Sequence, residues 1–207
     1  MSANGGQPRV IVIEDERELA DLYEMWLADE YDVRTAYSGE AALERFTEGE
    51  ADIILLDRRM PGLSGDEVAH RLDERGVDAQ VVMVTAVPPS TDVAPLPVDD
   101  YVTKPVEREQ LRSTVETAAL VGTYDDRVSE LLALTARQHA LETAVPAGEL
   151  ATSEEVRRLR AQVTNLQDSL DDTVAQLWSQ SNTNVFARVE PERTGHQAEG
   201  GEPDTHL

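Results

Sequence analysis

Short apolar stretches alternate with amphipathic stretches in the first 120 residues. Ile53 to Leu56 is an unbroken apolar run of four residues bounded by turn-forming residues, which is typical of a strand buried on both faces. Such strands, when they alternate with helices of about 10 to 15 residues, favour a parallel sheet covered by helices. We therefore predict an α/β fold with a doubly wound, five-stranded parallel sheet. The expected strands span 9–13, 31–36, 52–57, 79–86 and 99–105, and the expected helices span 14–30, 38–49, 64–76 and 106–120.

The carboxyl ends of the expected strands carry acidic, hydroxyl and basic side chains. In a doubly wound sheet these ends lie along one edge, and ligands bind in the crevice there. The residues that the sequence places at this edge are Glu14, Asp15, Asp57, Thr85 and Lys104. Clustered carboxylates raise each other's pKa unless a cation neutralises them, and Mg²⁺ suits them because it takes oxygen ligands. Asp57 could then act as a nucleophile toward phosphorus, with Lys104 and Thr85 holding phosphoryl oxygens.

Each of these residues has a simpler interpretation when it is taken alone. Asp57 could cap a turn after its strand, Thr85 could be a capping hydroxyl, and Lys104 could be a solvated charge. The combination is specific because every residue falls at the end of an expected strand. The sequence therefore predicts a phosphoryl-transfer site with Mg²⁺ at this edge.

This arrangement resembles that of a two-component response regulator receiver domain over about residues 8–120. The resemblance implies a flavodoxin-like sheet with the strand order 2-1-3-4-5. It also implies that Asp57 is the phosphoacceptor and that a sensor histidine kinase is the phosphodonor. Glu14 and Asp15 would hold Mg²⁺ together with Asp57 and the backbone carbonyl of Arg59.

The same resemblance assigns roles to residues near the last two strands. Thr85 and Lys104 would contact the phosphoryl group, and Thr85 and Tyr101 would be the switch residues. The peptide bond between Lys104 and Pro105 is expected to be cis, which costs little for a bond that precedes proline.

The sequence departs from the receiver pattern in two places. Glu14 replaces the first aspartate of the commoner acidic pair, which would alter metal affinity. Four prolines in residues 87–98 cannot continue a regular helix where receivers have their fourth one. This region forms part of the usual output and dimerisation face, so dimer geometries taken from the family are in doubt. Arg58 and Arg59 are expected to pair with surface acids.

After residue 122 the pattern becomes helical. One amphipathic stretch covers 124–145, Pro146-Ala147-Gly148 breaks the chain, and Thr152 or Ser153 can cap a second helix. Apolar residues of the second helix follow a 3,4 heptad spacing, which indicates a helical hairpin or a coiled coil. These residues are Val156, Leu159, Val163, Leu166, Leu170 and Leu177, with Thr173 among them.

The second half resembles the HalX output domain over about residues 120–180, a family known from receiver proteins of salt-loving archaea. A generic coiled-coil linker is the alternative interpretation. The expected organisation is a disordered start at 1–7, a receiver domain at 8–120, a helical HalX-like domain at 121–182 and a disordered tail at 183–207. The second helix is the expected seam for a homodimer.

Composition limits the possible partners. The formal net charge of -23 repels nucleic acid and suits a very salty cytoplasm. The chain has no cysteine, and therefore no disulfide or thiolate metal site. The N-terminus shows no leader and no apolar run is long enough to span a membrane, so we expect a cytoplasmic protein without membrane contact.

Three functions compete at this level. The leading one is a phosphorylation-switched signalling protein, not an enzyme, whose helices contact an unknown downstream protein. The second is a phosphorylation-controlled transcription factor. The sequence disfavours DNA as a partner, because no DNA-reading helix is apparent and Arg157 to Arg160 is a small basic island in an acidic domain. The third is an Asp-nucleophile phosphatase, which would carry a second aspartate where this chain has Arg59.

Overall fold

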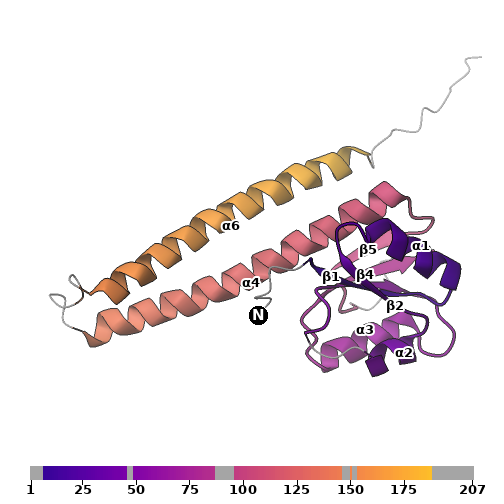
Figure 1. Ribbon diagram of the computed structural model, residues 1–207, viewed down its shortest axis with the longest axis horizontal. Helices are drawn as coiled ribbons and strands as arrows, with labels where there is room; N and C mark the ends of the chain where they lie inside the picture. The colour runs from indigo at the N-terminus through magenta and orange to yellow at the C-terminus, as the bar shows by residue number, and fades with distance from the viewer. Residues whose placement is uncertain (1–6, 46–48, 87–95, 146–149, 151–152, 188–207) are drawn as a thin grey trace, which may run out of the picture.

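The computed structural model describes residues 7–45, 49–86, 96–145, 150 and 153–187. Figure 1 shows two parts, a sheet with helices on both faces and a long helical hairpin that extends from it. The strands are β1 (Arg9–Ile13), β2 (Asp32–Ala36), β3 (Ile53–Asp57), β4 (Gln80–Thr85) and β5 (Asp100–Thr103). The helices are α1 (Arg17–Leu27), α2 (Gly39–Arg45), α3 (Gly65–Glu74), α4 (Arg108–Ala144) and α6 (Glu154–Ala187).

The sheet has the predicted topology. Its five strands are parallel and lie in the order β2-β1-β3-β4-β5. The register pairs Ile13 with Leu56, Asp57 with Val84, and Thr85 with Thr103. The carboxyl ends of the strands are thereby aligned along one edge, and the predicted α/β fold class is confirmed.

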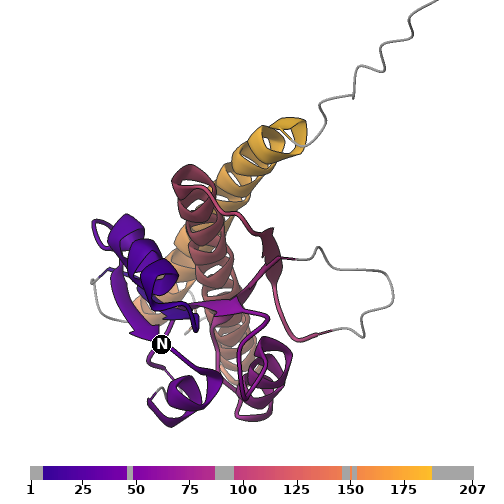
Figure 2. The same ribbon diagram turned by 90° about the vertical axis from the view of Figure 1, so that its right-hand side faces the viewer.

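Two apolar layers cover the sheet, one on each face. Ile53 and Leu55 of β3 pack into a cluster with residues of α1 and α4, whereas Ile54 and Leu56 pack into a cluster with residues of α2 and α3. Figure 1 shows α1 and α4 on one side of the sheet and α2 and α3 on the other, and Figure 2 gives the view turned by 90°. Because both faces are covered, every residue of β3 is buried, which explains its unbroken apolar sequence.

Helix boundaries in this part follow from local capping. Ser64 accepts a hydrogen bond from the backbone N–H of Glu67, whose carboxylate in turn accepts one from the backbone N–H of Ser64. Ser38 accepts a hydrogen bond of 3.1 Å from the N–H of Ala41 at the start of α2. Gly76 follows α3 with φ +67°, a conformation that favours glycine at a helix end.

One sequence-based expectation is wrong at the junction between the two parts. The prediction ends one helix at Leu120 and begins another at Tyr124, but α4 is a single helix of 37 residues that passes through Gly122. A glycine inside a helix costs only about 1 kcal/mol. Packing offsets this cost on both sides of Gly122, because Val115 lies in the core of the sheet and the later turns of α4 contact α6. The expected domain boundary at residue 120 therefore falls within a helix.

Helix α6 packs against the second part of α4 to form the hairpin. The residues of α6 that are buried there are Val156, Leu159, Leu170 and Thr173, at the predicted heptad spacing. The hydroxyl of Thr173 accepts a hydrogen bond of 2.7 Å from the Arg127 guanidinium of α4, a polar contact that helps to define the register of the two helices. Ser153 caps α6 by accepting from the N–H of Val156. Helix α6 continues to Ala187, past the expected end of the helical domain at 182.

Two predictions lie outside the described residues. They are the chain break at Pro146-Ala147-Gly148 and the irregular structure of residues 87–95.

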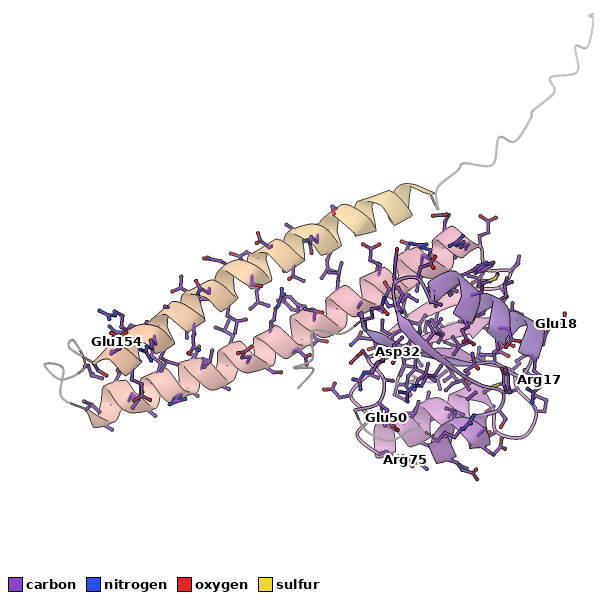
Figure 3. The ribbon with its side chains drawn as sticks, viewed as in Figure 1. Arg17, Glu18, Asp32, Glu50, Arg75 and Glu154 are labelled. Carbon is purple, nitrogen blue, oxygen red and sulfur yellow. The ribbon has the colours of Figure 1, made fainter. Side chains whose placement is uncertain are left out.

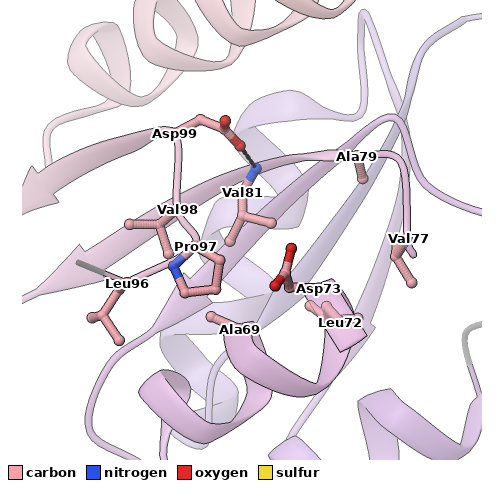
Figure 4. Close-up of a pocket in the computed structure, with 10 residues that line it drawn as sticks. All are labelled: Ala69, Leu72, Asp73, Val77, Ala79, Val81, Leu96, Pro97, Val98 and Asp99. Carbon is pink, nitrogen blue, oxygen red and sulfur yellow. Dashed lines mark hydrogen bonds between the residues drawn. The ribbon is translucent and has the colours of Figure 1, made fainter. Parts of the chain in front are cut away.

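A pocket of about 330 Å³ lies between α3 and the segment that leads into β5 (Figure 4). Its walls include Leu72, Asp73 and Asp99, and the carboxylate of Asp99 accepts a 2.7 Å hydrogen bond from the N–H of Val81 near the start of β4. No described helix is both long and apolar enough to cross a membrane.

Candidate functional site

Three carboxylates meet at the carboxyl edge of the sheet. Glu14 and Asp15 follow β1, and Asp57 is the last residue of the neighbouring strand β3. Each of the three side chains offers an oxygen that lies within 4.8 Å of the others. Glu14 and Asp57 are buried and Asp15 is half-buried, so the cluster is largely removed from bulk water. The ends of the expected strands predict this convergence from the sequence.

Lys104 enters the site from the end of β5. Its ammonium donates a 2.7 Å hydrogen bond to Oε2 of Glu14 and forms an ion pair of 3.0 Å with Oδ1 of Asp57. The backbone N–H of Lys104 donates to the carbonyl of Thr85 at 2.7 Å, which fixes the start of the side chain beside β4. The only lysine of the chain is therefore shared by two buried carboxylates.

Burial and the lysine act in opposite directions on the acids. Burial raises the pKa of Glu14 and of Asp57 above the ordinary carboxyl value, while hydrogen bonds from Lys104 lower both by less. Asp15 raises the pKa of Asp57 further, and the backbone N–H of Arg59 lowers it. Burial lowers the pKa of Lys104, but hydrogen bonds to Glu14 and Asp57 more than offset this, so that it lies above the ordinary value. The cluster has more negative charge than one ammonium neutralises.

A divalent cation fits this donor set. Among the described residues, Oε1 of Glu14 is the one buried side-chain oxygen without a hydrogen-bond partner. An unpaired buried carboxylate oxygen is costly, and a hard cation with oxygen ligands would satisfy it. Oxygens of Asp15 and Asp57 are close enough to share the same ion. These observations favour a site for a hard divalent cation formed by the three acids.

The remaining residues predicted for the site lie around this cluster. Thr85 is buried at the end of β4, and Tyr101 is half-buried on β5, opposite Met83. The side chain of Arg59 is exposed, and its backbone follows Asp57 in the loop after β3. The Lys104–Pro105 bond is cis, as predicted.

The loop after Asp57 shows one predicted contact and one close approach that the sequence-based site does not include. Arg58 forms an ion pair of 3.0 Å with Asp66 of α3, which confirms for this arginine the expected pairing with an acid. Gly65, the first residue of α3, donates its N–H to the carbonyl of Arg58 at 3.0 Å. A Cβ atom at position 65 would lie 2.3 Å from the backbone oxygen of Asp57. In the sequence, the glycine that directly follows the capping Ser64 is the feature from which this close approach could be predicted.

We expect Gly65→Ala to destabilise the protein by about 1 to 3 kcal/mol, because the methyl group would push the backbone of Asp57 away from α3. Gly122→Ala is the matched control, since its Cβ would meet only the side chain of Gln80 at 3.4 Å. The control should stabilise α4 by about 0.5 to 1 kcal/mol. Urea unfolding of both variants measures the difference, and equal shifts in one direction would contradict the close approach at Gly65.

Comparison with known families agrees with the geometry. The family model of the response regulator receiver domain matches residues 10–116, and that of the HalX domain matches residues 120–187. Both are families of regulatory domains.

Two curated relatives cover different shares of the chain. A Haloferax volcanii protein, provisionally described as a transcriptional regulator, is 42% identical over 135 residues. That alignment spans 65% of this chain but only 23% of the Haloferax protein. The transcriptional regulatory protein DltR of Streptococcus agalactiae is 27% identical over 192 residues, which cover 88% of this chain and 85% of DltR.

Solved receiver structures share the fold of the first part. The response regulator TrrA of Thermotoga maritima, in complex with Mg²⁺-BeF, is 33% identical with a TM-score of 0.50 and covers 54% of this chain and 99% of its own. The signal receiver domain of a Vibrio parahaemolyticus protein, provisionally described as a LuxO repressor, is 26% identical with a TM-score of 0.54 and covers 59% and 98%. The chain thus belongs to the response regulator receiver family of two-component signalling, with a HalX domain after its receiver.

Proposed function

We propose that the protein is switched by phosphorylation of Asp57 and that a sensor histidine kinase supplies the phosphoryl group. The observation that carries this proposal is the pairing of the Asp57 carboxylate with Lys104, 3.0 Å away, beside two further carboxylates at the same edge of the sheet. Structural ion pairs are common, but one lysine among three clustered acids suits a site that accepts a dianionic group together with a cation.

The residues of the site have distinct parts in the transfer. A carboxylate oxygen of Asp57 attacks phosphorus, and the bond from phosphorus to the kinase histidine breaks as the new O–P bond forms. The histidine nitrogen keeps the electron pair of the broken bond. Lys104 then offers its ammonium to a phosphoryl oxygen, and the Thr85 hydroxyl is the expected second donor. Their positions support these roles, since Thr85 ends β4, which adjoins β3, and Lys104 directly follows β5, which adjoins β4.

Bound Mg²⁺ would neutralise charge on the transferring group and hold its oxygens. The ligands from this chain would be carboxylate oxygens of Glu14, Asp15 and Asp57 and the backbone carbonyl of Arg59. The structure of the related response regulator TrrA was solved in complex with Mg²⁺-BeF, which supports the proposal that this chain also binds the metal.

Helix α4 connects the site to the hairpin. Val106, just before α4, and Leu111, within it, lie in the core of the sheet shortly after Lys104. Helix α4 then continues to Ala144 as one arm of the hairpin. If phosphorylation displaces Lys104 or Tyr101, the movement would be transmitted to the hairpin through α4, which is one continuous helix. We therefore propose that the hairpin presents the output surface to a downstream protein.

The packing of α6 on α4 restricts the homodimer seam that the sequence predicts on the second helix. Leu159 and Leu170 of α6 are buried, and this helix packs against α4 of the same chain. A homodimer would have to use the outer faces of the hairpin, where Leu132 and Trp178 are exposed.

A second candidate function is transcriptional control, which the descriptions of both curated relatives favour. Direct DNA contact by the hairpin is disfavoured because its basic island is paired with acidic residues. Arg157 and Arg158 pair with Glu154, and Arg160 pairs with Glu142, so each arginine of the basic island already has an acidic partner within the hairpin. Figure 3 labels Glu154 at the end of the hairpin farthest from the sheet. The hairpin surface is compatible with control of transcription through a protein partner. The cytoplasmic location is a separate prediction.

Labelling of the wild-type protein tests the proposal. Acetyl phosphate with Mg²⁺ should add one phosphoryl group, seen as a mass shift of the intact protein, because the small donor replaces the kinase and releases acetate. A metal chelator should reduce the labelled fraction by about tenfold or more, since the cluster then keeps its uncompensated charge. Labelling at the same rate with the chelator would contradict the proposal that a metal takes part. Labelling of a residue other than Asp57 would contradict the proposal that Asp57 is the phosphoacceptor.

A further inference from the structure

The peptide unit between Arg58 and Arg59 forms a hydrogen bond through each of its two polar groups. The carbonyl of Arg58 accepts a hydrogen bond of 3.0 Å from the N–H of Gly65, the first residue of α3. The N–H of Arg59, on the same peptide unit, donates to the carboxylate of Asp57. Because this peptide bond is trans and planar, its C=O and N–H point in opposite directions. The unit therefore connects the start of α3 to the carboxylate of Asp57.

The side chain of Arg58 joins this peptide unit to α3 a second time. Its Nε donates to Oδ1 of Asp66 at 3.0 Å, and its Nη2 donates to Oδ2 of the same carboxylate at 3.2 Å. Two parallel bonds of this kind fix an orientation as well as a distance. The Arg58 side chain is 20% exposed and the Asp66 side chain 34%, so the pair is partly shielded from water. Asp66 also lies in the first turn of α3, where the helix dipole favours a carboxylate.

We propose that the ion pair between Arg58 and Asp66 positions the phosphoacceptor, because it holds the peptide unit whose N–H is bound to the Asp57 carboxylate. This inference rests on the metal site of the proposed function, in which Asp57 and the backbone carbonyl of Arg59 are ligands of Mg²⁺. Arg58 and Asp66 are positioning residues that act through the backbone and do not touch the reacting atoms. An ordinary surface ion pair would contribute only to stability.

The affinity for Mg²⁺ distinguishes these two roles, because they predict opposite signs for Arg58→Met. Arg58 directly follows Asp57, so the loss of its positive charge would by itself tighten the binding of a cation to the acidic cluster. The loss of orientation in the Asp57 carboxylate and in the backbone after it would weaken that binding. We expect the second effect to be the larger one. Calorimetric titration of the full chain with Mg²⁺ should show binding weakened by about tenfold.

Two further variants connect this effect to the ion pair. Asp66→Asn should also weaken Mg²⁺ binding, but its addition to Arg58→Met should change the affinity by less than about twofold, because the pair is already broken. Arg9→Met is the matched control, since Arg9 pairs with Asp52 at 2.8 Å near the start of β3, at the opposite end of the strand from Asp57. It removes the same charge from a pair of similar exposure and should leave the Mg²⁺ affinity within about twofold.

Amide hydrogen exchange of the metal-free protein, followed by NMR, gives a measurement that does not depend on Mg²⁺. Arg58→Met should raise the exchange rate of the Gly65 N–H by about tenfold, because the Arg58 carbonyl that accepts from it is held less firmly. Arg9→Met should leave this rate unchanged. Unchanged exchange at Gly65 in Arg58→Met, or Mg²⁺ binding that is equal or tighter, would overturn the inference and leave the metal site intact. Failure of the wild-type protein to bind Mg²⁺ would overturn the metal site, and the inference with it.

Discussion

Asp57→Asn is expected to abolish phosphorylation by acetyl phosphate with Mg²⁺, a loss of about a hundredfold or more, because an amide is not a nucleophile toward phosphorus. The substitution preserves the size of the side chain and leaves Lys104 its contact with Glu14, so the fold should persist. Intact-mass measurement after a fixed time with the phosphodonor reports the labelled fraction. Labelling of the variant at the wild-type level would show that another residue accepts the group.

Asp52→Asn is the matched control for this experiment. Asp52 immediately precedes β3 and Asp57 ends it, so the two residues lie at opposite ends of one strand. Asp52 forms an ion pair of 2.8 Å with Arg9 and is remote from Lys104 in the sheet. Its loss should leave labelling unchanged and cost at most about 1 kcal/mol, since the pair is partly exposed. A control that also lost labelling would indicate a general effect of the substitution on the fold.

The positions of the acidic residues could be predicted because the sheet is parallel and buried on both faces. The apolar run before Asp57 marks a strand, and parallel strands bring their carboxyl ends to one edge. Lys104 was placed there on the same argument, through the short strand that contains Val102. These inferences need only the direction and the end of each strand.

Contacts between side chains could not be predicted in the same way. The hydrogen bond of Lys104 to Glu14 joins residues 90 positions apart and depends on the length of the glutamate side chain. Continuity of α4 through Gly122 was missed because a glycine and a change of pattern both suggest a break. Whether the helix continues or breaks at the glycine is decided by packing on either side of it, and local helix propensity does not include this packing.

The hairpin should come apart when charge is placed on its buried seam. Leu159→Asp combined with Leu170→Asp should destabilise the packing of α6 on α4 by about 3 to 5 kcal/mol per site, because each change removes a buried apolar group and adds an unpaired carboxylate. A helix without its partner is marginal in water, so α6 should also lose helical structure. Hydrogen exchange across α6 and the far-ultraviolet circular dichroism measure both effects.

Two features of the chain make this experiment specific to the hairpin. Gln162→Asp with Gln167→Asp adds the same charge at exposed positions of α6 and should leave its amides protected. Among the described residues, neither apolar cluster on the sheet includes a residue of α6, so labelling of Asp57 should survive in both double variants. Unchanged protection of α6 after the leucine substitutions would contradict the packing of its seam on α4. Sedimentation of the same proteins at high salt then tests whether the hairpin holds a homodimer together. A dimer that dissociates when α6 detaches depends on the folded hairpin. A dimer that persists is held by another surface.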